Sequence, residues 1–345
     1  MVKRAVVLFN LGGPDKPSSI QPFLFNLFND AAIINLPNPV RWLLAKSISK
    51  RRAPIAEKIY AEIGGGSPLL ELTQKQAVAL EIKLNQNERI SSKVFIAMRY
   101  WHPMIMATAT LVKNFNPDEI ILLPLYPQFS TTTTGSSFKA WKSAVKKIGL
   151  NKPTKEVCCY PIDENLVAAQ ADLLKKESSK TKQNIRVLFS AHGLPKKIIQ
   201  KGDPYQWQIE QTARAIAVKA GLDKKNWFIC YQSRVGPLEW IGPSLDEEIK
   251  KASKDNIGII VLPIAFVSEH SETLVELDIE YRNMAEDMGV PYYGRVPAIG
   301  THPSFILGLS VIVDNASKSD LRILSGRSNR ICPVGRSFCG QGENG

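Results

Sequence analysis

The sequence predicts an α/β protein made of two Rossmann-like halves with parallel sheets and an active-site cleft between the halves. Three observations predict this fold. Short apolar runs without polar alternation, typical of buried parallel strands, alternate with amphipathic stretches typical of helices. Three motifs recur in the same order in the two halves of the chain. The chain has 345 residues, enough for about two domains at roughly 150 residues each.

The elements follow from these patterns. Six apolar runs are the expected strands: Ala5–Leu11, Val94–Met98, Ile120–Leu125, Ile185–Ser190, Trp227–Tyr231 and Ile257–Ala265. Amphipathic stretches between them predict helices at Ser67–Leu84, Tyr205–Ala220 and Ser244–Ala252. The clearest repeat pairs IILLPLYPQFSTTT from Ile120 with IIVLPIAFVSEHSET from Ile259. We place one domain at residues 1–165, a second at 166–300, and a C-terminal helix with a cysteine-containing tail at 301–345.

Composition limits the class of protein. Hydrophobic residues make up 44% of the chain, which is enough to bury a core and argues against general disorder. The net charge of +12 is compatible with nucleic acid, an anionic membrane, an anionic substrate or a plain compositional bias. The lysines are scattered and do not interleave with aromatic residues, so a nucleic-acid partner is the weakest of these readings. No apolar run approaches the roughly 18–20 residues that span a bilayer, and the N-terminus lacks a signal-peptide cleavage site, which together predict a cytoplasmic protein.

One segment, about residues 21–58, has no counterpart in the second half. Large apolar side chains run through it into the densest basic cluster of the chain, Lys46–Arg52. One interpretation is ordinary core packing. The other is an apolar lip with cationic flanks that docks to a membrane or covers a hydrophobic ligand.

Ligands of parallel α/β sheets bind at the carboxyl ends of the strands. Polar groups follow each apolar run there: Asn10, residues 99–102, 128–134, 190–192, 232–234 and 268–272. His192 comes directly after a buried strand, in FSAHGLP. A histidine in a turn is often simple polar surface, but this position favours a functional one.

The segment Ser268–Tyr281 (SEHSETLVELDIEY) follows the most hydrophobic strand. If it is helical, with Ser268 as the cap, its four glutamates lie on one face at about one-turn spacing: Glu269, Glu272, Glu276 and Glu280. Cations are sparse nearby in the sequence, Arg282 being the first. A solvated acidic face is one interpretation. Beside His270, the carboxylates also suit capture of a divalent cation such as ferrous iron, or proton relay.

Two other motifs are less specific. Gly64–Pro68 (GGGSP) fits neither phosphate-binding glycine pattern, so it predicts a turn before a helix.

The chain has five cysteines, and this odd number favours reduced thiols or a metal cluster over a disulfide framework. Cys332 and Cys339 are separated by six intervening residues in the tail, a spacing unlike that of a zinc knuckle.

The chain resembles the ferrochelatases over nearly its whole length. The resemblance rests on seven blocks in one order: LFNLGGPD at Leu8, KRRAPIAEKIYAEIGGGSPL at Lys50, MRYWHP at Met98, YPQFSTTTTGSS at Tyr126, SAHGLP at Ser190, YQSRVGP at Tyr231 and PIAFVSEHSETLVELDIEY at Pro263. It implies the chelatase fold and the insertion of ferrous iron into protoporphyrin IX, which forms protohaem and releases two protons in the final step of haem biosynthesis.

The resemblance also implies roles for residues. His192 and Glu272 would face each other across the porphyrin as catalytic and metal-site residues, and which receives iron first stays open. His270, Glu276 and Glu280 would form an acidic track. Residues that match porphyrin contacts are Arg52, Tyr60, Ser67, Arg99 and Tyr100. The 21–58 segment would be the lip over the porphyrin and would make peripheral contact with the inner membrane face.

The chain departs from the cluster-containing members of the family. Some ferrochelatases hold a [2Fe–2S] cluster, but Thr131 stands where one version has its internal cysteine, and the tail offers only two. A set using Cys158, Cys332 and Cys339 is a candidate. Three other functions are compatible with these residues: a coproporphyrin ferrochelatase, a cobalt or nickel chelatase acting on a more carboxylated tetrapyrrole, and a non-enzymatic haem or metal carrier.

Overall fold

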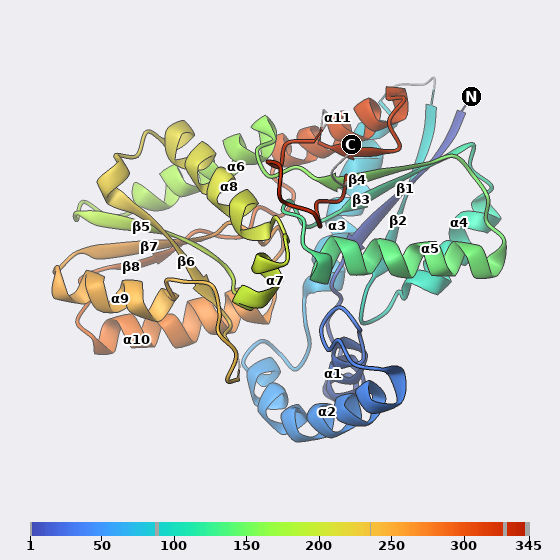
Figure 1. Cartoon of the computed structure of the whole chain (residues 1–345). Coiled ribbons are helices and arrows are strands. Elements are labelled where there is room, and N and C mark those ends of the chain that lie inside the picture. The colour runs from blue at the N-terminus through green and yellow to red at the C-terminus, as the bar shows by residue number, and fades with distance from the viewer. Residues whose placement is uncertain (1, 87–89, 235, 327–329, 342–345) are drawn as a thin grey trace. The chain divides into compact units, whose positions relative to one another are not determined.

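The computed structural model describes residues 2–86, 90–234, 236–326 and 330–341. The chain divides into two compact units, whose elements are labelled in Figure 1. Unit 1 comprises Met1–Cys159 and Leu309–Arg330, and unit 2 comprises Tyr160–Gly308 and Ile331–Gly345. The domain boundaries near residues 165 and 300 stay a prediction. Val235 of the YQSRVGP motif, and residues 327–329 and 342–345 of the C-terminal region, lie outside the described residues.

Unit 1 is built on a five-stranded sheet whose paired strands are all parallel, in the order β2-β1-β3-β4-β9. The strands are β1 Val2–Asn10, β2 Ile90–Met98, β3 Glu119–Pro124, β4 Thr154–Cys159 and β9 Ile323–Ser325. Its helices are η1 Pro17–Ser19, α1 Ile20–Phe28, α2 Asn38–Ala61, α3 Leu69–Leu84, α4 Ile105–Phe115, the π-helical turn η2 Thr131–Gly135 and α5 Ser136–Ile148. Helix α11, Pro303–Lys318, runs from unit 2 into unit 1.

The core of unit 1 forms where β1 is covered by helices. Residues Ala5–Phe9 of β1 are fully buried, as an apolar central strand of a parallel sheet should be. Phe9 packs edge-on against Phe138 and Trp141 of α5, with ring centroids 5.6 and 5.8 Å apart. Figure 1 shows α5 beside the sheet.

Unit 2 has a four-stranded parallel sheet in the order β6-β5-β7-β8. The strands are β5 Ile185–His192, β6 Trp227–Gln232, β7 Gly258–Pro263 and β8 Tyr293–Arg295. The helices are α6 Glu164–Ser178, α7 Lys196–Gln200, α8 Tyr205–Ala220, η3 Lys224–Asn226, α9 Leu245–Lys254, the π-helix η4 Glu272–Glu280 and α10 Tyr281–Asp287.

The topology confirms the predicted repeat. In the two halves the strands that share a motif are β1 and β5, β2 and β6, and β3 and β7. The order β2-β1-β3-β4 in one sheet corresponds to β6-β5-β7-β8 in the other. All six predicted strands are present, whereas β4, β8 and β9 were missed because they are short or carry polar residues. Within the described residues, no helix has the length and apolarity needed to cross a bilayer.

Candidate active site

His192 is the last residue of β5, at the carboxyl edge of the unit 2 sheet. It lies opposite Gln232 of β6, and its carbonyl accepts a 3.1 Å hydrogen bond from the hydroxyl of Tyr205. The imidazole side chain is 37% exposed. His192 is therefore held through its backbone while its ring stays open to a ligand.

Glu272 contacts His192 directly. Its Oε2 lies 2.8 Å from His192 Nδ1, and Glu272 is the first residue of η4, which follows β7. This differs from the expectation that the two residues face each other across a porphyrin, because no ring fits between hydrogen-bonded groups. The physical reason is that β5 and β7 are neighbours in one sheet, so both side chains leave the same sheet edge.

A second carboxylate, Glu276, lies one helical turn further on and is tied to the end of β6. Ser233 donates to it from its backbone N–H at 2.8 Å and from its hydroxyl at 2.5 Å. The side-chain amide of Gln232 donates to Glu276 Oε2 at 3.0 Å. The sequence pattern places residues 232–234 as polar groups at a strand end but predicts no specific role for them. Their role depends on contacts with η4, which follows more than 35 residues later in the chain.

The charges of these groups are coupled. Burial raises the pKa of Glu276, and the Glu272 charge raises it further, to about 7. Burial opposes the charge of His192, but the Glu272 carboxylate outweighs it and raises the His192 pKa above its usual value. Burial would likewise raise the pKa of Glu272, yet the His192 charge and hydrogen bond hold it well below its usual value. Near neutral pH the site therefore holds an ionised Glu272 beside Glu276, which gains and loses a proton there, and beside His192, whose pKa is raised.

The raised pKa of Glu276 predicts a pH-dependent stability cost. Its folded-state pKa of about 7 exceeds the ordinary 4.5, so folding favours the protonated carboxyl. The stability that this preference adds is fully present below pH 4.5 and is lost as pH rises through 7, where the buried group ionises. We expect Glu276→Gln to unfold with a free energy ~1–3 kcal/mol higher than the natural chain at pH 8, and nearly equal at pH 4. Urea unfolding at both pH values measures this, with Glu280→Gln as the exposed control. Equal stabilities at pH 8 would contradict it.

The other two members of the predicted acidic track differ in position: His270 lies near Glu272, whereas Glu280 does not join the site. His270 Nδ1 is 3.2 Å from the carbonyl of Ser268, so Nδ1 carries the proton, and Nε2 is turned toward Glu272 at 3.9 Å. Burial lowers the pKa of His270, which favours the neutral ring. Glu280 is exposed at the far end of η4.

The predicted four-carboxylate face is wrong at its first member. The helix begins at Glu272 rather than beside Ser268, so Glu269 precedes it and pairs with Arg295 at 2.5 Å. The helix is also π-helical, with a wider turn than an α-helix. Positions four apart, such as Glu272 and Glu276, therefore stay aligned. No local sequence pattern could reveal Arg295, because it follows Glu269 by 26 residues.

In unit 1, Arg99 and Tyr100 join a buried network around Asp30. The Asp30 carboxylate accepts from Arg99 Nη2 at 2.8 Å, from the Tyr100 hydroxyl at 2.8 Å and from Ser136. Arg99 Nε also donates to Ser136 at 2.7 Å. Burial would raise the pKa of Asp30, but these donors and Arg99 together lower it. The sequence pointed to Arg99 and Tyr100 but not to Asp30, which lies 69 residues before Arg99.

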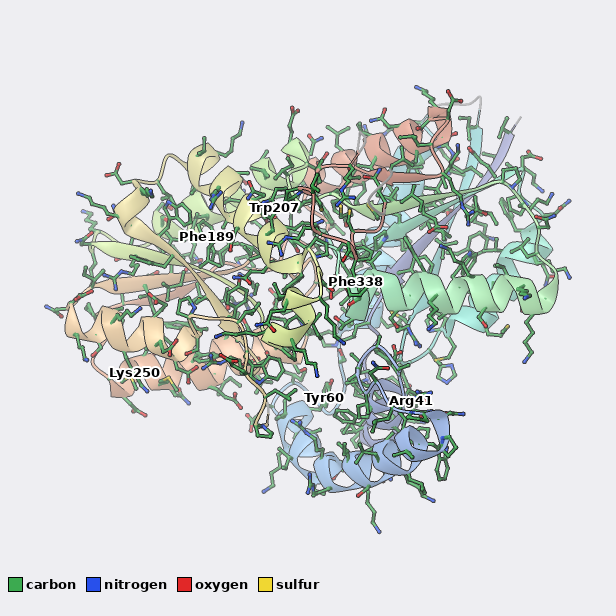
Figure 2. All side chains as sticks on the ribbon, viewed as in Figure 1. Arg41, Tyr60, Phe189, Trp207, Lys250 and Phe338 are labelled. Atoms are coloured by element: carbon green, nitrogen blue, oxygen red, sulfur yellow. The ribbon has the colours of Figure 1, made fainter. Side chains whose placement is uncertain are left out.

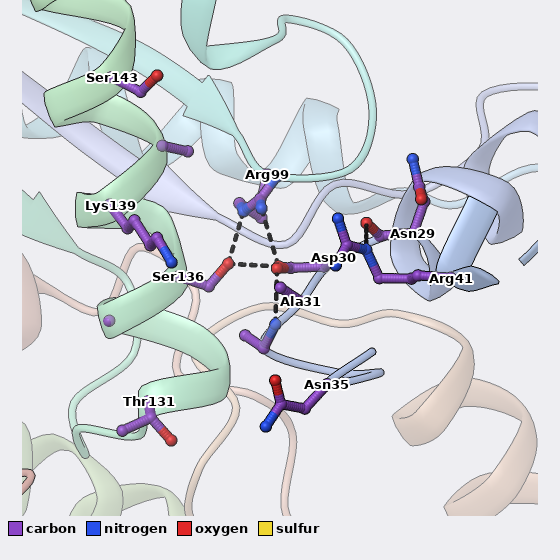
Figure 3. A pocket seen from close by; sticks show the side chains of 13 residues that line it. Asn29, Asp30, Ala31, Asn35, Arg41, Arg99, Thr131, Ser136, Lys139 and Ser143 are labelled. Atoms are coloured by element: carbon purple, nitrogen blue, oxygen red, sulfur yellow. Dashed lines mark hydrogen bonds and ion pairs between the residues drawn. The ribbon is translucent and has the colours of Figure 1, made fainter. Parts of the chain in front are cut away.

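Arg99 and Asp30 line a hollow of about 610 Å³, drawn in Figure 3. Its polar lining also includes Arg41 from α2 and Lys139 from α5. Arg41 donates to the carbonyls of Asn29 and Leu36. A volume of this order suits a small-molecule ligand, and three cations against one carboxylate suit an anionic one.

The remaining predicted porphyrin contacts lie on the 21–58 segment and the turn after it. Arg52 and Tyr60 are on α2, and the Tyr60 ring is 8% exposed in a cluster with Tyr100 and apolar residues of α1. Ser67 follows the glycine turn, and its N–H donates to the carbonyl of Pro14 at 2.7 Å. A Cβ on Gly13 would lie 2.5 Å from Ser67, so only glycine permits this approach.

The 21–58 segment contains both a packed core and an exposed apolar surface. Phe23 and Leu24 are buried against α2, as is Ile20 just before the segment. Facing solvent are Ile33, Leu36, Val40, Trp42, Leu43 and Leu44, each 38–63% exposed. We call these six residues the apolar lip. Lys46 lies over the Trp42 ring at 5.1 Å, and Figure 2 shows the side chains of α2, including Arg41 and Tyr60.

The candidate cluster ligands are buried cysteines. Cys158 is in β4 of unit 1, and Cys332 and Cys339 are in the tail of unit 2, where the Gln208 amide lies 3.2 Å from the Cys332 sulfur. In the part of the chain that the structure describes, no group of three or more His, Cys, Asp or Glu side chains is arranged to hold a metal ion.

Solved structures place this fold in a class. SirB from Bacillus subtilis with Fe3+ matches with a TM-score of 0.55 and 13% identity, over 92% of this chain and 96% of that one. The sirohydrochlorin chelatase SirB from Bacillus subtilis subspecies spizizenii in complex with cobalt matches with a TM-score of 0.52 and 11% identity, over 89% and 92%. At such identities the likeness concerns the fold alone, and the fold is that of the chelatases.

Sequence relatives narrow the class. The family model described as Ferrochelatase matches residues 3–317. The ferrochelatase of Pelagibacter ubique is 54% identical over 314 residues, 90% of this chain and 91% of its own length. That of Caulobacter vibrioides is 54% identical over 322 residues, 92% and 91%. The chain belongs to the ferrochelatase family, as the sequence motifs predicted.

Proposed function

We propose that this chain inserts ferrous iron into protoporphyrin IX to form protohaem, the final step of haem biosynthesis. The observation that carries the proposal is the joined set of His192, Glu272 and Glu276, whose pKa values are shifted apart at one sheet edge. Metal insertion needs groups that accept protons near neutral pH beside a carboxylate that stays ionised. This site supplies both.

The reaction exchanges two protons for one divalent cation. Each pyrrole N–H bond breaks with its electron pair left on nitrogen, and the two nitrogen lone pairs then bind iron, so charge balances. With Nδ1–H directed to Glu272, the neutral form of His192 has Nε2 as a proton acceptor. Glu276, with a pKa of about 7, takes up and passes on protons at neutral pH. His270 keeps its unprotonated Nε2 near Glu272, where it suits the incoming cation.

Unit 1 supplies the porphyrin-binding groups in this proposal. A porphyrin is a flat apolar disc with carboxylate edges, so it needs apolar surface and cations. Arg52 and Arg99 are the cations for its carboxylates, Ser67 offers a hydroxyl, and Tyr60 and Tyr100 form the apolar support behind them. Arg99 is anchored by a buried carboxylate, Asp30, which fixes its direction.

The test is an anaerobic assay of the purified protein with ferrous iron and protoporphyrin IX, followed by metalloporphyrin absorption. Coproporphyrin runs in parallel. Turnover of protoporphyrin at a rate well above the protein-free reaction is expected. Absence of turnover with either ring would reject the enzyme, and faster turnover of coproporphyrin would reassign its substrate.

We also propose that the protein is cytoplasmic and rests peripherally on the inner membrane face through its apolar lip. The exposed Trp42 and Leu43 and the nearby basic cluster 46–52 support it, because apolar insertion and cationic attraction together bind anionic lipid. Arg51 and Arg52 contribute two charges to that cluster.

The lip predicts charge-dependent binding to vesicles. Each basic residue near an anionic surface contributes about 1 kcal/mol, so Arg51→Ala with Arg52→Ala should lower the partition coefficient roughly 30-fold. Co-sedimentation with phosphatidylglycerol–phosphatidylcholine vesicles measures this. Removing two exposed lysines of unit 2, Lys224→Ala with Lys225→Ala, is the matched control. An equal loss in both double variants would assign binding to net charge rather than to the lip.

For the iron–sulfur cluster, Cys158, Cys332 and Cys339 remain predicted ligands only, and no step is derived through it. Four ligands are needed, and three cysteines leave the set incomplete. Charge-transfer absorption in anaerobically purified protein, with iron in excess of the active site, would support a cluster. Colourless protein would reject it.

A further inference from the structure

We propose that Arg295 is a positioning residue that clamps the π-helix η4 and thereby sets the carboxylates of Glu272 and Glu276 against His192. This inference rests on the proposed function of that site. It concerns a residue to which neither the motifs nor the helix pattern pointed.

The clamp joins two points on either side of the site residues. Arg295 pairs through Nη1 with Glu269 Oε1 at 2.5 Å. Its Nε donates to Asp278 Oδ1 at 2.8 Å, and Nη2 pairs with Asp278 Oδ2. The bonds to Asp278 form the two-pronged geometry that a guanidinium provides and a lysine cannot. One side chain thus holds residues nine positions apart, with His270, Glu272 and Glu276 between them.

The clamp is buried and anchored to the sheet. The Arg295 side chain is 10% exposed, and Arg295 is the last residue of β8, opposite Val261 of β7. Strand β7 is the one whose chain continues into η4. Glu269 Oε1 also accepts from the backbone N–H of Ala298 at 2.8 Å, so the start of the clamped segment is fixed to the β8 loop as well.

Other β8 contacts run to the same helix. The Tyr293 hydroxyl donates to the carbonyl of Leu277 at 2.6 Å. Arg282 donates to the carbonyls of Asp278 at 3.1 Å and Tyr293 at 3.1 Å. A π-helix is rare because its hydrogen-bonded turns are less favourable than α-turns, and it persists where surrounding contacts impose it. Among these contacts, those of Arg295 run to carboxylates.

The helix geometry matters for the chemistry. Glu272 meets His192 at 2.8 Å and Glu276 meets Ser233 at 2.5 Å, so both carboxylates depend on the rotation of η4. Without the clamp, the segment can relax toward an α-helix, which turns side chains by a different angle per residue. The carboxylates would then leave His192 and Ser233. Outer contacts that orient metal-binding groups typically contribute 10–100-fold to affinity or activity.

The test compares Arg295→Gln, Arg295→Lys and Asp278→Asn with a matched control. Arg4 of unit 1 is also buried and also joins two carboxylates, Glu119 and Asp314, each at 2.8 Å, far along the chain from η4. Arg4→Gln therefore removes a similar buried pair without touching the clamp. Each variant is assayed for kcat, for KM of ferrous iron and of porphyrin, and for thermal unfolding.

For Arg295→Gln we expect kcat to fall 10–100-fold and KM for iron to rise several-fold, with KM for porphyrin within twofold. Arg295→Lys should recover part of the loss, and Asp278→Asn should show a smaller loss of the same kind. Arg4→Gln should lower thermal stability but leave KM for iron within twofold. Unchanged KM for iron in folded Arg295→Gln, or the same rise in Arg4→Gln, would overturn the clamp. If Arg295→Gln does not fold, Asp278→Asn decides by the same criterion.

A second readout separates this inference from the proposed function. Cobalt(II) binding to each variant, measured by calorimetry, needs no turnover. If the natural chain inserts no iron, the proposed function fails, and weaker cobalt binding by Arg295→Gln than by Arg4→Gln still supports the clamp. Equal cobalt binding by these two variants would reject the clamp, whatever the activity.

Discussion

Replacing His192 with alanine is expected to lower kcat for iron insertion by about 10² to 10⁴, the range for loss of a general base. The loss has two causes. The proton acceptor at the end of β5 disappears, and Glu272 loses the partner that lies 2.8 Å away and holds its pKa low. The anaerobic assay measures the effect, and KM for porphyrin should change little because the porphyrin contacts are placed on unit 1.

A matched control is available in unit 2. His302 also pairs with a carboxylate, its Nε2 lying 3.1 Å from Asp172, but it is distant in sequence from the site residues. His302→Ala should keep kcat within about twofold of the natural chain. A His192→Ala variant with near-natural turnover and normal thermal unfolding would remove His192 from the mechanism, and an equal loss in His302→Ala would indicate a general structural effect.

The second large effect is on stability. Asp30→Ala should lower the free energy of unfolding by about 3–5 kcal/mol, because removing one partner of a buried ion pair leaves the other charged and unpaired. The Asp30 side chain is 7% exposed and accepts from Arg99, Tyr100 and Ser136. Urea unfolding measures the loss. KM for porphyrin should rise as well, since Arg99 would lose its fixed direction.

The pKa of Asp30 gives this prediction a pH signature. Its folded-state pKa lies below the ordinary 3.8, so its contribution is present above pH 3.8 and is lost as pH falls through the folded value. Asp255→Ala, which breaks the half-exposed pair with Arg186, is the control and should cost less than about 1 kcal/mol. A similar loss of unfolding free energy in both variants at pH 7 would show that the Asp30 network stabilises the fold no more than a half-exposed ion pair does.

Much of the fold could be predicted from local pattern. Strands such as β1 and β7 are continuous apolar runs, because a parallel sheet covered on both faces demands them. Their repeat also predicted the matching topology of the two sheets. The short strand β8 could not be found this way, since Tyr293–Arg295 has neither length nor apolarity, and it forms because it pairs with β7.

Some features of the candidate site could likewise be predicted from local sequence patterns, and others could not. The positions of His192 and Glu272 after two strands could be predicted because strand ends and motifs are local features of a sequence, whereas their catalytic roles stay a prediction. Their direct contact was not, because it depends on β5 and β7 being neighbours. Likewise the pattern placed Glu269 on an acidic face, and the structure pairs it with Arg295 instead.

The sequence by itself determined the ferrochelatase family, the two repeated halves and the chemical groups at the strand ends. Only the tertiary structure decided that His192 is hydrogen-bonded to Glu272, that Glu269 is paired with Arg295, and that the acidic helix is π-helical. The reason is physical. Apolar periodicity and turn residues act over a few neighbours along the chain, whereas pKa values and ion pairs depend on distances between residues such as Asp30 and Arg99, which sequence separation does not specify.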